Sequence, residues 1–183
     1  MSAQQKLTPP AIGEIWPGKG GIYGGLRQYP EGLCHIIFAV EDVPGRHTYG
    51  DYGVNVDAES RTDGRANTLA LLAAMLKEQQ SANRFIHDLL SQIPDDQRSK
   101  HPAAIAAASY TADGHTDFYL PSIGELHHGW QFAPESFSSD WYYISSTQRS
   151  ASYAFSLLFV AGLQLIHDKY HELRVRPVRR FLQ

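Results

Sequence analysis

The chain has 183 residues, 43% of them hydrophobic and 19% charged, with a formal net charge of −3 at pH 7. This length and apolar content are enough to fill the core of one ordinary domain and argue against extensive disorder. The slightly acidic balance is unlike that of electrostatic nucleic-acid binders, and no apolar run reaches the roughly 18 residues that a membrane helix needs.

The first ten residues are polar and predict a flexible or docking arm, without the apolar segment of a secretory signal. From residue 11 to residue 183 we expect a single domain. Residues 12–29 carry six glycines among apolar and aromatic residues, which predicts short strands joined by tight turns. A phosphate-binding loop is not predicted, because the G-x-x-x-x-G-K-[ST] pattern is absent.

Residues 33–40 are almost continuously apolar and predict a buried, central strand. The only cysteine, Cys34, lies in this run. It has no intrachain disulfide partner and fits synthesis in a reducing cytoplasm, where a core cysteine acts as a small apolar side chain. Residues 41–64 are rich in turn-forming pairs and predict a loop, with residues 52–56 as a candidate short strand.

Three helices are predicted in the middle of the chain. Residues 66–80 place apolar side chains at helical spacing, from Leu69 to Leu76, and consist mainly of good helix formers. Residues 84–92 place Phe85, Ile86, Leu89 and Leu90 on one side. After a polar connector at residues 94–100, residues 102–110 form an alanine-rich segment with proline in its first turn.

Ser122 and Glu125, three residues apart, predict the start of a fourth helix. This spacing is a capping box, in which the serine side chain and the glutamate carboxylate each bind a backbone N–H of the other residue. Ile123, Leu126 and Trp130 then form an apolar stripe. Residues 141–145, 153–160, 164–167 and 173–178 predict strands, with Gly162 in a hairpin turn. The order of elements predicts one α+β domain with segregated helices and strands.

Catalytic and metal-binding patterns are missing from the sequence. Neither an H-E-x-x-H motif nor a Cys/His zinc pattern occurs among the nine histidines, and adjacent His127 and His128 diverge on a helix. There is no G-x-S-x-G nucleophile motif. We therefore expect no enzyme activity and no cofactor. Calcium stays open, because its oxygen ligands can come from separate loops without a linear motif.

Residues 130–153 mix aromatic side chains with serine, glutamine and arginine, a combination typical of recognition surfaces. Aromatic rings supply rigid contact area, and the polar side chains supply adaptable hydrogen bonds. An alternative interpretation places most of these rings in the core. Loops at residues 136–142, 147–152 and 49–54 are the candidate binding loops. The candidate ligand-binding residues are Trp141, Tyr142, Gln148, Arg149, Ser150 and Ser152.

Three sequence blocks carry a family resemblance: DFYLPSIGEL at residues 117–126, YYISST at residues 142–147 and VRPVR at residues 175–179. A strand with a glycine turn at residues 155–162 lies between the last two. This order resembles the DUF1566 (Lcl C-terminal-like) domains of phages and bacteria, which have a C-type-lectin-like fold. Phe118 and Ile144 depart from the family pattern but stay apolar. We expect Leu120 and Leu126 in the core, and Arg176 and Arg179 as structural pins.

The resemblance implies an α+β, C-type-lectin-like fold with short helices packed on small antiparallel sheets. It also implies a phage or prophage tail-fibre-associated receptor-binding protein, an adhesin that recognises a bacterial surface receptor without catalysis. A glycan is the leading candidate for that receptor. Expected partners are other tail or fibre subunits in a homo-oligomer on the virion, after synthesis in the host cytoplasm. The alternative is a structural virion protein that uses the domain for protein–protein assembly.

Overall fold

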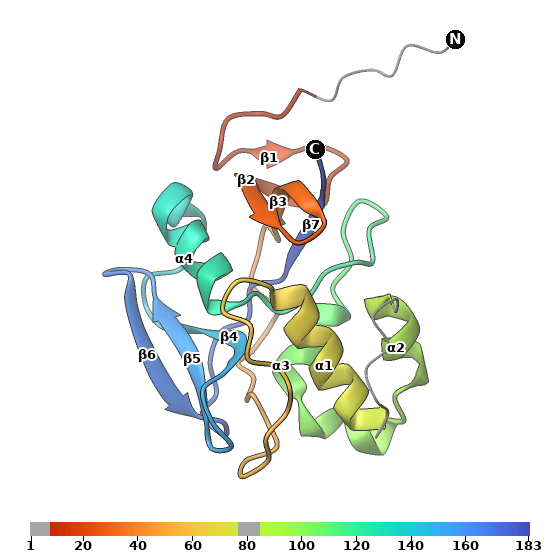
Figure 1. The fold of residues 1–183 in the computed structure, drawn as a ribbon. Coiled ribbons are helices and arrows are strands. Elements are labelled where there is room, and N and C mark those ends of the chain that lie inside the picture. Colours follow the sequence, from red (N-terminus) through yellow and green to blue (C-terminus); the bar gives the residue numbers. More distant parts are fainter. Residues whose placement is uncertain (1–7, 77–84) are drawn as a thin grey trace.

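The computed structural model describes residues 8–76 and 85–183. Its architecture has two small antiparallel sheets and several short helices, which confirms the predicted α+β class (Figure 1). Within the described ranges, no helix is long and apolar enough to cross a membrane.

The first sheet joins the two ends of the described chain. Its strands are β1 (Ile15–Trp16), β2 (Gly21–Tyr29), β3 (Gly32–Phe38) and β7 (Val178–Leu182), in the order β1-β2-β3-β7. All neighbouring strands are antiparallel. As predicted, β3 is central and buried. It has core on both faces, because Ile36 and Phe38 join the main core while Ile37 packs with Trp16 and Tyr23.

The position of β7 corrects the predicted final strand at residues 173–178. Leu173 and Arg174 form only isolated bridges, to His47 and Tyr143, and the regular strand begins at Val178. Pro177 has no N–H to donate to a ladder, which explains why pairing starts after it. Strand β7 contains Arg179 and Arg180, and this charged stretch lacks the apolar pattern that predicts a strand.

The second sheet comprises β4 (Tyr142–Gln148), β5 (Tyr153–Leu158) and β6 (Leu163–Asp168), antiparallel and in that order. The hairpin around Gly162 is as predicted, and the positive φ of +60° at that residue suits glycine. Strand β4 continues to Gln148, three residues beyond the predicted end. Residues 52–56 form no strand and belong to a loop.

The helices α1 (Gly64–Leu76), α2 (Ile86–Gln92) and α3 (Pro102–Ala108) lie together in Figure 1. The predicted connector forms a short 3-10 helix, η1 (Asp95–Lys100). The ends of the first two predicted helices, at residues 77–80 and 84, lie outside the described residues. Ile86 and Leu89 are buried as expected, whereas Phe85 is 64% exposed because it precedes α2 in an extended conformation.

Helix α4 (Ile123–Phe132) touches both sheets and is followed by a single 3-10 turn, η2 (Pro134–Ser136). The predicted capping box is present, and Ile123 and Leu126 are buried. Trp130 is 38% exposed and does not extend the buried stripe. Helix α4 therefore ties the sheets together through its first two turns.

Candidate functional site

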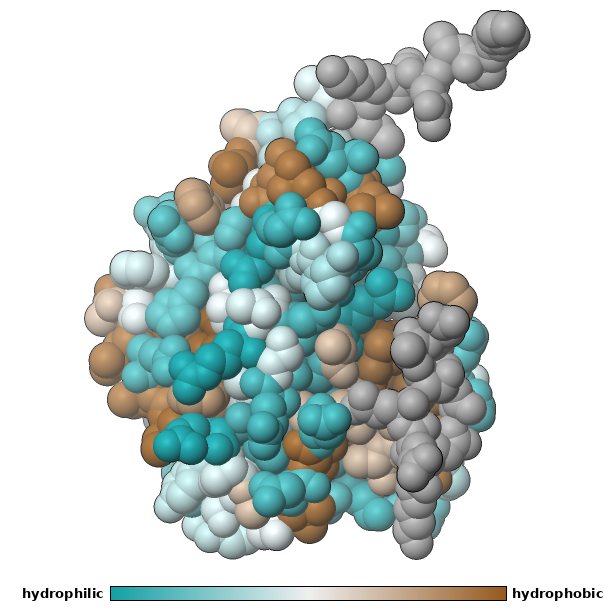
Figure 2. Space-filling model, in the orientation of Figure 1, coloured by the Kyte–Doolittle hydropathy of each residue, from teal (hydrophilic) through white to brown (hydrophobic). Residues whose placement is uncertain are grey.

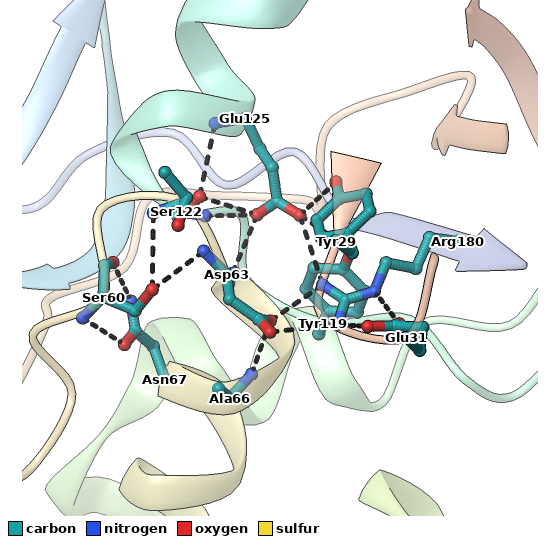
Figure 3. Close-up of polar contacts among 12 residues, drawn as sticks. Tyr29, Glu31, Ser60, Asp63, Ala66, Asn67, Tyr119, Ser122, Glu125 and Arg180 are labelled. Atoms are coloured by element: carbon teal, nitrogen blue, oxygen red, sulfur yellow. Dashed lines mark hydrogen bonds and ion pairs between the residues drawn. The ribbon is translucent and has the colours of Figure 1, made fainter. Parts of the chain in front are cut away.

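Glu125 is the centre of a buried polar network in the scaffold (Figure 3). Its carboxylate accepts hydrogen bonds from the hydroxyls of Tyr29 at 2.7 Å and Tyr119 at 2.8 Å, and from the backbone N–H of Gly64 at 3.0 Å. The N–H and hydroxyl of Ser122 donate two more. Burial and the carboxylate together raise the pKa of Tyr119. Since both oxygens are satisfied and closed to solvent, we assign Glu125 to the scaffold.

Arg180 joins this network from β7. Its guanidinium pairs with Glu31 at 2.6 Å and Asp63 at 2.8 Å, and it lies 3.9 Å from the centre of the Tyr29 ring. Only 4% of the Arg180 side chain is exposed. Bidentate pairs of this kind fix position and direction together. They hold β7, the β2–β3 turn and the start of α1 in one arrangement.

Two further arginines are structural pins, as predicted. Arg176 donates to Asp42 at 2.6 Å and to the carbonyl of Ser136 at 2.7 Å. Arg179 binds Asp117 with two hydrogen bonds, at 2.7 and 3.1 Å. These side chains are almost fully buried and have satisfied partners, so they are closed to a ligand.

Gln148, a predicted ligand-binding residue, is the last residue of β4 and is buried. The sequence predicts it in the loop at residues 147–152. Its Oε1 accepts from the backbone N–H of Val56 at 3.0 Å and from Lys169 at 2.8 Å, and its Nε2 donates to the Val56 carbonyl at 3.0 Å. All of these bonds lie inside the protein. Gln148 therefore positions the neighbouring loop and does not face a ligand.

Arg149, Ser150 and Ser152 belong to the turn between β4 and β5. Arg149 is exposed, and the two serines are half-buried. The backbone of the turn is tied to two neighbours, because Ala151 accepts a hydrogen bond from Gly53 and Ser152 accepts one from Lys169. The structure thus places these predicted residues on one surface beside the loop at residues 49–56.

The loop at residues 49–56 is fixed by contacts with Lys169 and Lys100. Gly50 donates to the Lys169 carbonyl at 2.9 Å and has a positive φ of +89°, and a Cβ there would overlap the carbonyl oxygen of Lys100. Asp51 is one of two non-glycine residues in the described ranges with a positive φ, at +43°. Such conformations persist only where the surroundings impose them. The loop presents Tyr52, which is 53% exposed.

Lys169 anchors the same loop from inside. Its side chain is inaccessible to solvent, and its ammonium group donates to the Val54 carbonyl at 2.6 Å and to Gln148 at 2.8 Å. The ammonium also lies 5.2 Å from the centre of the Tyr49 ring. Burial lowers the pKa of Lys169 to about 8. No carboxylate lies within ion-pair distance of this lysine among the described residues. Its hydrogen bonds to the neutral oxygens of Val54 and Gln148 therefore hold the loop in place.

Trp141 and Tyr142, the remaining predicted ligand residues, begin a row of aromatic rings on the surface. Neighbouring ring centroids in this row are 4.8 to 6.1 Å apart, which is contact distance for aromatic pairs. The row crosses three segments: the start of β4, the end of β6 with its following turn, and the loop at residues 49–56. The aromatic row consists, in order, of Trp141, Tyr142, His167, His171, Tyr170 and Tyr52.

The two ends of the aromatic row differ. At one end Arg46 lies 4.3 Å from the centre of the Trp141 ring and covers part of it. At the other end Tyr52 and Tyr170 are 53% and 59% exposed. The sequence indicated Tyr52 through its glycine-rich loop, whereas Tyr170 and His171 were missed because they follow β6 in a charged turn that gave no aromatic pattern.

Cys34 and Ser156 also carry groups that could react, and both residues are buried. Burial raises the pKa of Cys34, which disfavours the reactive thiolate. Ser156 is buried and hydrogen-bonded to His167 at 2.7 Å, within the sheet. No group of three or more His, Cys, Asp or Glu side chains in residues 8–76 and 85–183 could hold a metal ion.

Comparison with models of known protein families and with curated proteins gave no match. The resemblance to DUF1566 domains therefore rests on the sequence blocks at residues 117–126, 142–147 and 175–179. In the structure these blocks supply Glu125, strand β4 and the arginine pins, which are parts of the scaffold. The blocks do not include most of the aromatic row, so the function of that surface has to be inferred from its own side chains.

Proposed function

We propose that the chain is a phage or prophage tail-fibre-associated receptor-binding protein that recognises a bacterial surface structure without catalysis. The observation that carries the proposal is the aromatic row beside the polar turn at residues 149–152. Rigid rings next to serine and arginine side chains provide both contact area and adaptable hydrogen bonds. A glycan is the ligand that best suits this combination.

The scaffold supports the same proposal. Buried charges such as Glu125 and Arg180 are satisfied within the protein, so they stiffen the framework and leave recognition to the surface loops. Short helices on small antiparallel sheets are consistent with a C-type-lectin-like fold, to which we assign the chain on its sequence blocks. In such a framework the loops carry the variable function.

Display in several copies is part of the proposal. Single shallow surface sites bind weakly, and linking copies on one particle multiplies their effect through high effective concentration. A homo-oligomer on a tail fibre would provide this linkage. We place the protein in the virion, with other tail or fibre subunits as partners.

Binding of the purified chain to bacterial cells tests the proposal. The double variant Trp141→Ala with Arg149→Ala should lose most of its binding, because it removes one end of the aromatic row and the exposed cation of the turn. Trp130→Ala is a matched control, since Trp130 and Trp141 are both 38% exposed. Unchanged cell binding by a folded double variant would contradict the site, and no binding to any tested envelope would contradict the function.

Assembly within a virion is the second candidate function, and one surface feature favours it. Strand β6 is paired on one side only, with β5, within the described sheets. The exposed apolar residues Val160, Leu163 and Ile166 lie along this hairpin, and Figure 2 shows hydrophobic residues gathered on that side. Unpaired strand edges with apolar neighbours are ready sites for protein association. A pull-down that captures particle proteins but not envelope material would favour assembly.

A further inference from the structure

The exposed end of the aromatic row has a geometry of its own. Tyr170 and His171 are stacked, with ring centroids 5.8 Å apart and planes at 19°. The centre of the Tyr52 ring lies 5.0 Å from that of Tyr170, and the two ring planes are tilted by 43°. Each of the three side chains is about half exposed or more. We name Tyr52, Tyr170 and His171 the aromatic triad.

The side chains of the aromatic triad are more exposed to solvent, and so more accessible to a ligand, than those of the rest of the row. Trp141 is partly covered by Arg46, and Tyr142 and His167 are half-buried against each other, with centroids 4.8 Å apart. The tyrosines of the triad are more exposed, at 53% for Tyr52 and 59% for Tyr170, although His171 stacks against Tyr170. The exposed parts of the three rings together form a platform wider than a single ring.

The platform is also held in place before any ligand arrives. Tyr52 is flanked by hydrogen bonds from Gly50 to Lys169 and from Gly53 to Ala151, each 2.9 Å long. Tyr170 follows Lys169 directly, and the Lys169 side chain is bonded to the Tyr52 loop at Val54. Both tyrosines are therefore fixed to one buried anchor. A preorganised platform loses little conformational entropy on binding, which favours affinity.

The polar groups around the platform indicate the class of ligand. Asp168 lies 3.7 Å from His171, and Asn55 and Arg149 are exposed on the adjoining loops. Carboxylate, amide and guanidinium groups can bind sugar hydroxyls, and both signs of charge are present, so no net field favours an anionic ligand. Ring faces pack against the apolar C–H faces of sugar rings. A platform of several rings suits successive sugars of a chain.

We propose that the aromatic triad is a stacking subsite for a neutral saccharide chain. The inference rests on the proposed function, because it names the class of receptor that the adhesin recognises. It adds Tyr170 and His171 to the site and moves its centre from Trp141 to the loop at residues 49–56.

An array of neutral and anionic bacterial glycans, probed with the full chain, tests the ligand class. Neutral glycans should bind, and Tyr52→Ala and Tyr170→Ala should each weaken binding about tenfold, the effect of losing one aromatic contact. Tyr52→Phe and Tyr170→Phe keep the ring and should retain most of the affinity. Phe85→Ala, at an aromatic residue 64% exposed beside α2, should bind like the parent chain.

The outcomes separate this inference from the proposed function. If the chain binds cells but binds no neutral glycan, or if both folded alanine variants bind glycans like the parent chain, the inference is wrong while receptor binding stands. If the alanine variants lose capture of a particle protein and the chain binds no glycan, the triad is a protein interface. Thermal unfolding of each variant confirms that a loss of binding is not a loss of fold.

Discussion

Glu125 accepts five hydrogen bonds in the core, two of them from tyrosine hydroxyls. Burying a carboxylate is costly unless its oxygens are fully satisfied, so each donor matters more here than at the surface. Removing the charge leaves these donors facing a weaker acceptor. Arg180 is likewise a buried charge, and its guanidinium is bonded to Glu31 and Asp63.

Glu125→Gln should lower the free energy of unfolding by about 3 kcal/mol, the usual cost of breaking a buried charged network. The amide introduces two N–H donors where the network requires acceptors. Urea unfolding followed by circular dichroism measures the loss. Glu135→Gln, at an exposed glutamate in η2, is the control and should leave stability within about 0.5 kcal/mol of the parent. Equal stability of the two variants would contradict the assignment.

Lys169 makes stability depend on pH in the alkaline range. Its pKa is about 8 in the fold against 10.5 as its ordinary value, so between these pH values the unfolded chain holds the proton that the folded chain has released. Stability should therefore rise with pH from about 8, apart from other groups. Lys169→Met should be less stable at all pH values and lack this rise. Urea unfolding from pH 7.5 to 9.5 measures it, and parallel profiles would contradict the prediction.

Among the elements, the loop at residues 49–56 depends on residues that are distant from it in sequence. Gly50 fits beneath Lys100, Gly53 bonds the β4–β5 turn, and Val56 bonds Gln148 at the end of β4. The loop has little regular structure of its own, so its shape is set by these neighbours. A small change in the contact with Lys100 should move Tyr52.

Gly50→Ala should destabilise the protein and weaken receptor binding together, because the new Cβ overlaps the Lys100 carbonyl and the positive φ disfavours alanine. Gly53→Ala is a matched control: its φ is +85°, but a Cβ there meets nothing within 4 Å. We expect a loss of about 1 kcal/mol for Gly53→Ala and at least twice that for Gly50→Ala. Thermal unfolding and cell binding measure both effects. Equal losses would show that the Lys100 contact does not matter.

For the protein as a whole, several buried or half-buried histidines should make the fold sensitive to acid. Burial lowers the pKa of His35, His101, His128 and His167, which come from different parts of the chain. Below their ordinary pKa of 6.5 the unfolded chain gains protons that the folded chain excludes. Stability is therefore present above pH 6.5 and is lost as the pH falls.

The free energy of unfolding should fall between pH 6.5 and 5, by up to about 1.4 kcal/mol per pH unit for each fully excluded proton. His101→Gln should reduce this slope, since His101 is inaccessible to solvent. His87→Gln, at an exposed histidine of α2, should leave the slope unchanged. Urea unfolding at fixed ionic strength measures the slopes. A slope equal to that of the parent chain in His101→Gln would rule out this residue as a source.

Sequence patterns predicted the parts of the fold that depend on neighbours in the chain. The capping box of α4, the buried strand β3 and the hairpin around Gly162 each follow from local spacing and turn chemistry. The last strand was misplaced because β7 is rich in arginine, and its charges are neutralised only by residues such as Glu31 and Asp117 from elsewhere. Periodicity of apolar residues does not report such long-range pairs.

Residue types and their spacing were enough to predict the α+β class and to indicate Trp141, Tyr142 and Arg149 as candidate residues. The burial of Gln148 and the contact between Tyr52 and Tyr170 became visible only in the folded chain. They arise because Lys169, directly after β6, binds both Gln148 and the loop of Tyr52. The contact with the loop joins residues 115 positions apart and the contact with Gln148 joins residues 21 apart, so no local pattern encodes either of them.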